Sequence, residues 1–313
     1  MLFLLTDPTP ELCSGTVPRM MFYLYYSTLA RANSILRSNA LAQFRRSLRQ
    51  VPLLSRFLHR GEFRSADLLL PDKSGWVKVE SGLAQGIWLH LNLRKERGYW
   101  LGLHEVAVQQ LLKKLCSPAC SFYDIGAHIG FFSLAVARLI GPGGKVFAFE
   151  PDPENCLRLK EMAVRNTLQD QVRLVEAAVW SYTRPAGVPF RLGGSRRTLG
   201  GILADGIIPV LADGERKLVS TVSLDDFFHQ GNPLPDVIKI DVEGGECEVL
   251  KGGREVFSRA KPVLICEVHH ETAAHWITDW VTANGYDAVW QVPDELFPRL
   301  LLGEASEPPR NRC

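Results

Sequence analysis

The stretch SFYDIGAHIGFFSLA, residues 121–135, joins an apolar run typical of a buried strand to one typical of a helix, with an acid and two glycines between them. A tight glycine turn between a strand and a helix brings backbone N–H groups close to a ligand. We therefore expect the turn from Gly126 to Gly130, which includes Ala127 and His128, to bind a ligand. Features elsewhere in the chain indicate which ligand this turn binds.

The alternation of strand and helix continues beyond this stretch. Further apolar runs typical of buried strands lie at 145–150, 172–179, 235–241, 261–269 and 286–292. Strands that are apolar on both faces and alternate with helices indicate a parallel sheet that is covered on both sides. The expected fold class is therefore α/β: a Rossmann-like, mainly parallel sheet with helices on both faces.

The regions around this alternating core have different patterns. Residues 63–93 contain two alternating runs around a glycine-bounded turn, which is typical of a β-hairpin, and helical spacing returns at 104–115. Residues 181–222 are glycine-rich and interrupt the alternation, so we expect an insertion at the sheet edge. The expected organisation is a basic helical arm at 1–60, a hairpin and helix lead-in at 61–120, the main domain at 121–303 with the edge insertion at 181–222, and a tail at 304–313.

Charge is distributed unevenly between the arm and the rest of the chain. The first 60 residues carry eight arginines and two acids, a charge of +6, although the whole chain has a net charge of only +2. Apolar residues recur at helical spacing among these arginines. Such a helix either packs on the main domain or lies on an anionic membrane surface, and both interpretations remain open.

Cysteine usage favours a reducing compartment. The seven cysteines include no CxxC pair and have no histidine partners at zinc-finger spacing. An odd number of cysteines, several of them inside apolar strands, is typical of a cytosolic protein. We therefore expect a cytoplasmic location. The basic arm could also bring the protein into contact with the inner face of the membrane. No nucleic-acid partner is expected.

Two acids help to identify the ligand of the glycine turn. Glu150 ends the next strand, 20 residues after Gly130, where its two oxygens can accept from the vicinal hydroxyls of a ribose. A nicotinamide dinucleotide uses the same position, but its G-x-G-x-x-G fingerprint is absent, and two phenylalanines follow Gly130. Asp124 would repel a pyrophosphate and attract a cationic ligand. S-adenosylmethionine, which has an amino group, a sulfonium and a ribose but no phosphate, fits better.

Four motifs together resemble the FkbM family of S-adenosylmethionine-dependent methyltransferases: FYDIGAHIGFFS, VFAFEPDP, VIKIDVEGGECEVLKGG and VLICEVH. The resemblance covers roughly residues 85–300 and implies a class I methyltransferase fold. It also implies O-methylation of a hydroxyl on a sugar or polyketide. Two positions depart from the family pattern: His128 stands where asparagine is common, and Gly245 where alanine is usual. His128 is either a polar contact to the cofactor or an exposed turn residue.

Candidate catalytic residues follow the fourth and fifth expected strands. Asp241, Glu267 and His269 should meet there, because ligands of open α/β sheets bind beyond the carboxyl ends of the strands. We expect His269 to act as the general base, since imidazole titrates near neutral pH. Asp241 would orient that base, contact the cofactor, or bind a divalent metal with Glu267 and with His269 as a ligand. Ala177, which leaves room for a flat ring, is expected beside the adenine.

The function that these observations favour is O-methylation, dependent on S-adenosylmethionine, of a hydroxyl on a sugar, glycolipid or related natural-product acceptor. The expected partner is thus a small molecule or glycan. Two alternatives remain at this point: an NAD-dependent oxidoreductase, and a non-catalytic binding protein that retains the fold. The sequence leaves the requirement for a divalent metal and the oligomeric state open.

Overall fold

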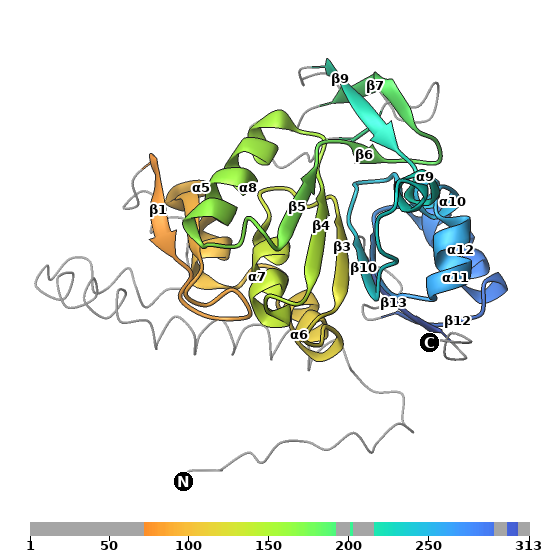
Figure 1. Ribbon diagram of the computed structural model, residues 1–313, viewed down its shortest axis with the longest axis horizontal. Helices are drawn as coiled ribbons and strands as arrows, with labels where there is room; N and C mark the ends of the chain where they lie inside the picture. Colours follow the sequence, from red (N-terminus) through yellow and green to blue (C-terminus); the bar gives the residue numbers. More distant parts are fainter. Residues whose placement is uncertain (1–71, 192–200, 203–215, 291–298, 306–313) are drawn as a thin grey trace, which may run out of the picture.

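The computed structural model describes residues 72–191, 201–202, 216–290 and 299–305 (Figure 1). The basic arm expected at 1–60 lies outside the described residues. Within them, the chain folds into a central sheet with helices on both sides, a small second sheet at one end and a hairpin lead-in (Figure 1).

Seven strands form the central sheet in the order β12-β13-β11-β10-β3-β4-β5. Neighbours among β3, β4, β5, β10 and β11 pair in parallel, whereas β13 pairs antiparallel with both β11 and β12. The strands are β3 (Ser121–Ile125), β4 (Lys145–Phe149), β5 (Val172–Val175), β10 (Val237–Ile240), β11 (Val263–Val268), β12 (Tyr286–Trp290) and β13 (Arg299–Ala305). This is the doubly wound Rossmann order with one antiparallel strand added, which confirms the expected fold class.

Helices cover both faces of this sheet (Figure 1). On one side lie α6 (Val106–Leu115), α7 (Phe131–Ile140) and α8 (Pro153–Arg165); on the other lie α9 (Leu224–His229), α10 (Glu246–Lys251), α11 (Arg254–Ala260) and α12 (Glu271–Ala283). The strands separate two apolar cores, since Phe122 packs into one and its neighbour Tyr123 into the other. Burial on both faces explains why these strands are continuously apolar.

The lead-in contains the predicted hairpin, in which β1 (Ser74–Lys78) pairs antiparallel with β2 (Trp88–Asn92). A helix that the sequence did not predict, α5 (Leu93–Leu101), follows directly. The Asn92 side chain caps it by accepting from the first free backbone N–H groups of the helix. Arg158 of α8 donates to Glu96 of α5 at 2.8 Å, so the lead-in is attached to the main domain.

The expected third strand, 172–179, is divided in the structure. β5 ends at Val175, and the Ala177 N–H turns back to the Val175 carbonyl at 2.8 Å. The residues that follow form β6 (Ala178–Val179), which pairs in parallel with β9 (Arg216–Val222) in a separate sheet. β7 (Arg184–Arg191) and β8 (Gly201–Ile202) complete that sheet, and together with β9 they lie within the insertion predicted at 181–222, whereas β6 precedes it. The prediction of one strand over 172–179 was therefore wrong.

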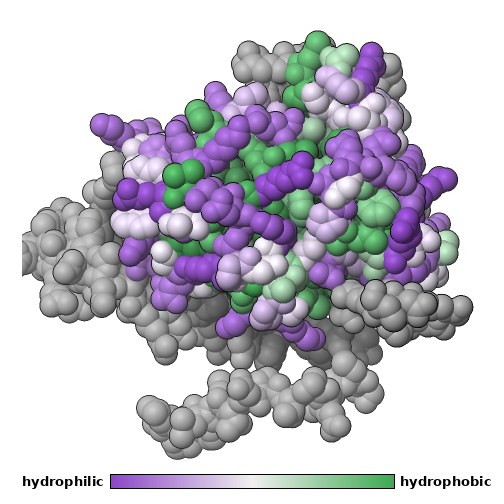
Figure 2. All heavy atoms as spheres, in the orientation of Figure 1, coloured by the Kyte–Doolittle hydropathy of each residue, from purple (hydrophilic) through white to green (hydrophobic). Residues whose placement is uncertain are grey.

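Hydrophilic residues cover much of the face shown in Figure 2, and hydrophobic residues show mainly between them. In the described part of the chain, no helix is both long and apolar enough to cross a bilayer.

The two glycines of the turn after β3 are required by tight packing as well as by backbone conformation. Gly126 has φ +80°, and a Cβ there would lie 1.8 Å from the Asp241 carbonyl oxygen. Gly130 has φ +83°, and its Cβ would lie 2.5 Å from Cγ of Leu159 in α8. The turn is thus pressed against the end of β10 on one side and against α8 on the other.

Replacing Gly126 with alanine should therefore destabilise the protein even without a ligand. Both the positive φ and the clash with a backbone oxygen oppose a side chain, and together they should lower the free energy of unfolding by at least about 2 kcal/mol. Chemical denaturation of Gly126→Ala and wild type measures this difference. Gly141→Ala is a matched control, because Gly141 has φ +72° but a Cβ added there would meet nothing within 4 Å. Equal loss in both variants would show that packing against Asp241 contributes nothing.

Candidate active site

Glu150 closes the glycine turn from the end of β4. Its Oε2 accepts from the His128 N–H at 2.7 Å, and its Oε1 accepts from the Asp152 N–H at 2.9 Å. The carboxyl is only 6% exposed, and burial raises its pKa to about 7 despite these hydrogen bonds. Oε1 also accepts from the Asn155 side-chain amide at 3.4 Å, whereas Oε2 has a second acceptor position that is open to a hydrogen bond from a ligand hydroxyl.

Asp124 lies near the end of β3, just before the glycine turn, and its side chain is buried. It is 1% exposed, and its Oδ2 accepts from the Ser133 hydroxyl of α7 at 2.6 Å. Its Oδ1 lies 3.9 Å from Nζ of Lys239, which also donates to Asp241 at 3.2 Å. Burial raises the pKa of Asp124. The cation beside Asp124 in this structure is thus a lysine of β10.

The carboxyl ends of β10 and β11 bring an imidazole and several carboxylates together. Nε2 of His269 lies 3.8 Å from Oδ1 of Asp241 and 3.7 Å from Oε1 of Glu267. On its other side, Nδ1 lies 2.7 Å from Oε1 of Glu246. The structure therefore places the three expected catalytic residues in one cluster, with ligand atoms within 4.8 Å of one another.

Glu243 completes the negative surroundings of this imidazole, with Oε1 at 3.5 Å from Nε2 of His269. Burial favours the neutral ring, but hydrogen bonds and charges of Glu243 and Glu246 outweigh burial and raise the pKa of His269 to about 10. Burial and the neighbouring Asp241 raise the pKa of Glu267 to about 8. At neutral pH both ring nitrogens of His269 therefore carry a proton in this state, so the imidazole can act as the expected general base or as a ligand only after Nε2 loses its proton.

The lead-in contributes residues to the site that sequence reasoning did not select. Glu105 has a left-handed backbone, with φ +42°. Its Oε1 lies 2.8 Å from Nε2 of His104. Its Oε2 is buried and has no hydrogen-bond partner in the described part of the chain. The ring centres of Tyr99 and His104 lie 4.1 Å apart with the planes tilted by 41°, and the Tyr99 hydroxyl lies 3.3 Å from Nδ1 of His128. Burial lowers the pKa of His128 to about 4, so this ring is neutral. The available signal was in the stretches GIWLHLNL (86–93) and ERGYWLGLHE (96–105), which look like the lead-in of the FkbM family.

Ala177, which was expected beside the adenine, lies in the turn between β5 and β6 and is 6% exposed. It packs against the apolar core on the α9–α12 side of the sheet.

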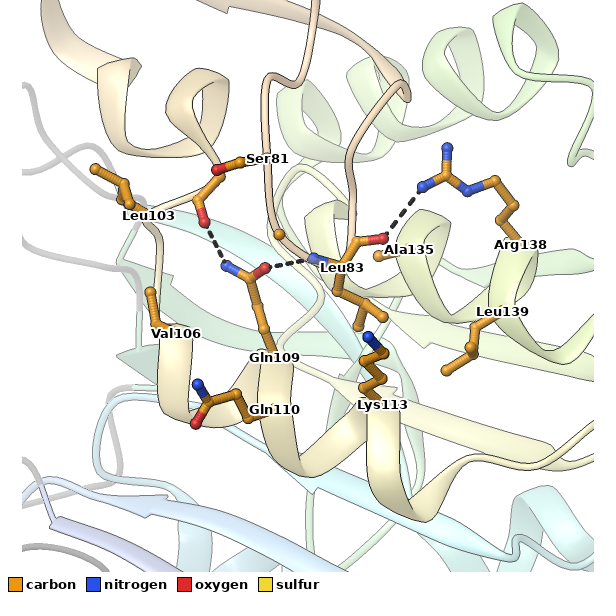
Figure 3. Close-up of a pocket in the computed structure, with 12 residues that line it drawn as sticks. Ser81, Leu83, Leu103, Val106, Gln109, Gln110, Lys113, Ala135, Arg138 and Leu139 are labelled. Carbon is orange, nitrogen blue, oxygen red and sulfur yellow. Dashed lines mark hydrogen bonds between the residues drawn. The ribbon is translucent and has the colours of Figure 1, made fainter. Parts of the chain in front are cut away.

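A cavity of about 570 Å³ lies away from this cluster, between the 81–83 turn, α6 and α7 (Figure 3). None of its lining residues belongs to the acidic cluster. Figure 3 shows Gln109 reaching into the loops beside it, where its side chain accepts from the Leu83 N–H and donates to the Gly102 carbonyl. Gln109 also donates to the carbonyl of His104 at 2.6 Å. The cavity wall therefore holds the loop that carries His104 and Glu105.

Comparison with known proteins is consistent with this geometry. Residues 124–288 match the family model described as Methyltransferase FkbM domain. The chain is 30% identical over 223 residues to the hexuronic acid methyltransferase AglP of Haloferax volcanii, which covers 68% of this chain and 78% of that protein. It is 32% identical over 223 residues to the 31-O-demethyl-FK506 methyltransferase FkbM of Streptomyces tacrolimicus, which covers 64% of this chain and 81% of that protein.

Among solved structures, the methyltransferase FkbM of Methylobacillus flagellatus matches with a TM-score of 0.43 and 19% identity, covering 66% of this chain and 54% of that chain. The assignment of the fold rests on the strand order of the central sheet described above.

If Glu150 binds the cofactor ribose as a carboxylate, affinity for S-adenosylmethionine should depend on pH near its pKa. The pKa of about 7 implies that affinity falls as the pH is lowered from 8 to 6. Glu150→Gln should bind at least about tenfold more weakly at pH 8, since a hydrogen bond to a charged group contributes about 1.5–3 kcal/mol. It should also lose the pH dependence. Calorimetric titration at three pH values measures both.

The same substitution has a second readout in stability. The folded pKa of Glu150 lies above its ordinary value of 4.5, so the native state binds more protons between pH 4.5 and 7. The contribution of Glu150 to stability is therefore fully present below pH 4.5 and is lost as the pH rises through 7. Glu150→Gln should remove this decline. Unchanged affinity together with an unchanged pH profile would contradict the assignment of Glu150.

Proposed function

This chain belongs to the FkbM family of S-adenosylmethionine-dependent methyltransferases, and from that premise we propose that it methylates a hydroxyl of a sugar, glycolipid or related natural-product acceptor. The observation that carries the proposal is the cluster of Asp241, Glu267 and His269 beside the point where the strand order of the sheet reverses. The names of the two relatives, one for a hexuronic acid and one for a 31-O-demethyl natural product, support a hydroxyl-bearing acceptor of this class.

We assign the cofactor to the turn between β3 and α7. Glu150 would accept from the ribose hydroxyls, while the backbone from Gly126 to Gly130, with Ala127 and His128, lines the same crevice. Ala177 would lie near the adenine. Asp124 would act through Lys239 and Asp241, which places negative charge next to the cationic end of the cofactor.

Methyl transfer needs an acceptor oxygen in line with the sulfonium and a place for the hydroxyl proton. The oxygen forms a bond to the methyl carbon while the carbon–sulfur bond breaks and its electrons return to sulfur, which leaves S-adenosylhomocysteine. The proton leaves to the carboxylates around His269. Asp241, Glu267 and His269 are therefore the proposed catalytic residues.

The family assignment argues against the nicotinamide alternative, and turnover measurements decide between an enzyme and a non-catalytic protein of the same fold. We propose the domain division expected from the sequence, with the main domain at 121–303. We further propose a cytoplasmic protein whose arm at 1–60 contacts an anionic membrane and brings lipid-linked acceptors near the site.

Replacing His269 with alanine should lower turnover by about 10²–10⁴-fold, the magnitude typical of losing acid–base assistance, because the imidazole lies between the carboxylates that take the hydroxyl proton. Binding of S-adenosylmethionine should remain near normal. Formation of S-adenosylhomocysteine with uronic-acid glycosides or hydroxylated natural products as acceptors measures the loss. His270→Ala is the matched control, because His270 is the exposed neighbour. If His269→Ala kept most of its activity, the catalytic assignment would fail.

The proposal for the arm can be tested with full-length protein. Replacing Arg37, Arg45, Arg46 and Arg49 with glutamine should reduce sedimentation with phosphatidylserine vesicles, because each well-placed cation contributes about 1 kcal/mol near an anionic leaflet. Wild-type sedimentation should also weaken as salt is added. Equal sedimentation of both proteins would mean that these arginines do not contact lipid.

A further inference from the structure

We propose that Asp241, Glu267 and His269 hold a divalent cation, Mg²⁺ or Mn²⁺, that binds the acceptor hydroxyl. This inference rests on the proposed transfer of a methyl group to a hydroxyl, and it assigns a specific task to the three residues. Their ligand atoms come from the ends of two adjacent parallel strands, β10 and β11, so the sheet itself determines their spacing.

The two distances from His269 to the other proposed ligands suit a shared ion. Mg²⁺ or Mn²⁺ takes oxygen and nitrogen ligands at roughly 2.1 Å in an octahedron, so two ligand atoms on one ion lie about 3–4.2 Å apart. Nε2 of His269 lies 3.8 Å from Oδ1 of Asp241 and 3.7 Å from Oε1 of Glu267. These separations are too long for direct hydrogen bonds but match ligands of a common cation.

The orientation of the imidazole is the second observation. Glu246, at 0% exposure, fixes Nδ1 of His269 at 2.7 Å and thereby aims Nε2 at the other carboxylates. A carboxylate on one ring nitrogen with a metal on the other is the common arrangement of histidine ligands. The second oxygen of Glu246, Oε2, is buried and has no hydrogen-bond partner among the described residues. With Nε2 bound to a cation the imidazole would be neutral, and the cation would supply the positive charge that a buried, partly satisfied carboxylate needs.

The side chains around the cluster carry an excess of negative charge that a divalent cation would compensate. Four carboxylates lie within 4 Å of His269: Asp241, Glu243, Glu246 and Glu267. Lys239 compensates part of this charge through Oδ2 of Asp241, which leaves Oδ1 directed toward the imidazole. Two hard carboxylate oxygens and one imidazole are a suitable set for Mg²⁺ or Mn²⁺, with open positions for water or substrate.

The cation gives the hydroxyl a path to lose its proton. Coordination to the ion lowers the pKa of the acceptor hydroxyl. The proton passes to the carboxylate of Glu243, which lies beside the cluster but outside the proposed ligand set. The oxygen then bonds to the methyl carbon as the carbon–sulfur electron pair returns to sulfur.

The test uses full-length protein and Mn²⁺ alone, without cofactor or acceptor. Electron paramagnetic resonance of free Mn²⁺ should show one saturable site in wild type, and that site should be lost in His269→Ala and in Glu267→Gln. Glu246→Gln, which retains the shape but not the charge, should weaken Mn²⁺ binding by about 10- to 100-fold. Glu271→Gln, an exposed acid at the start of α12, is the control and should bind as wild type does. Thermal melts confirm that each variant is folded.

The outcomes separate this inference from the proposed function. A wild-type protein with no saturable Mn²⁺ site, or binding that is unchanged in both His269→Ala and Glu267→Gln, overturns the cation. Methyl transfer to a hydroxyl that survives exhaustive chelation also overturns the cation but leaves the proposed function intact. Activity that is lost on chelation and restored by Mg²⁺ supports both. The wild type could show a saturable Mn²⁺ site that the ligand variants lose, and could bind S-adenosylmethionine, yet methylate no hydroxyl. That result supports the cation and overturns the proposed function.

Discussion

The rest of the site depends on one buried ammonium group, that of Lys239. It is 4% exposed and lies between Asp124 of β3 and Asp241 at the end of β10, with its Nζ 5.1 Å from the centre of the Phe132 ring. Burial alone would lower its pKa, but Asp241 and Asp124 outweigh burial and raise the pKa, so the lysine is charged. Removing one partner from such a buried group costs about 3–5 kcal/mol, because the remaining charge is uncompensated.

This lysine connects the two halves of the site. Asp124 fixes the start of α7 through Ser133, and therefore the glycine turn that would carry the cofactor. Asp241 belongs to the cluster around His269, where the acceptor would react. Because Lys239 contacts both acids, the cofactor turn and the reaction centre share one electrostatic support. The close approach of Gly126 to the Asp241 carbonyl adds a steric constraint at the same point.

The lead-in, which precedes the alternating strands and helices in the sequence, contributes side chains to the site. Gln109 holds the loop of His104 and Glu105 by hydrogen bonds to its backbone, and Tyr99 contacts both His104 and His128. Glu105 keeps an unfavourable left-handed backbone there, which is a feature that surrounding structure must stabilise. The lead-in thus forms a wall of the site, and its described residues, from 72 on, form a hairpin and two helices.

The sequence by itself determined the parallel sheet, the glycine turn and the convergence of Asp241, Glu267 and His269. These follow from local patterns, since continuous apolar runs, glycine positions and strand ends are read along the chain. Tertiary structure decided what these patterns cannot show. The break after Val175 arises from pairing of β6 with β9, more than 35 residues away. The unpredicted β13 exists because β11 and β12 both offer it an edge.

The state of His269 was also decided only by the tertiary structure. From the sequence, imidazole alone suggested a base that titrates near neutral pH. In the folded chain, Glu246 of α10 reaches Nδ1 and three further carboxylates face Nε2, which raises the pKa of the ring and surrounds it with the negative charge that a bound cation requires. The strand ends that carry these charges are predictable from the sequence, but the distances between the groups, and therefore the shift in the pKa of the ring, depend on the folded structure.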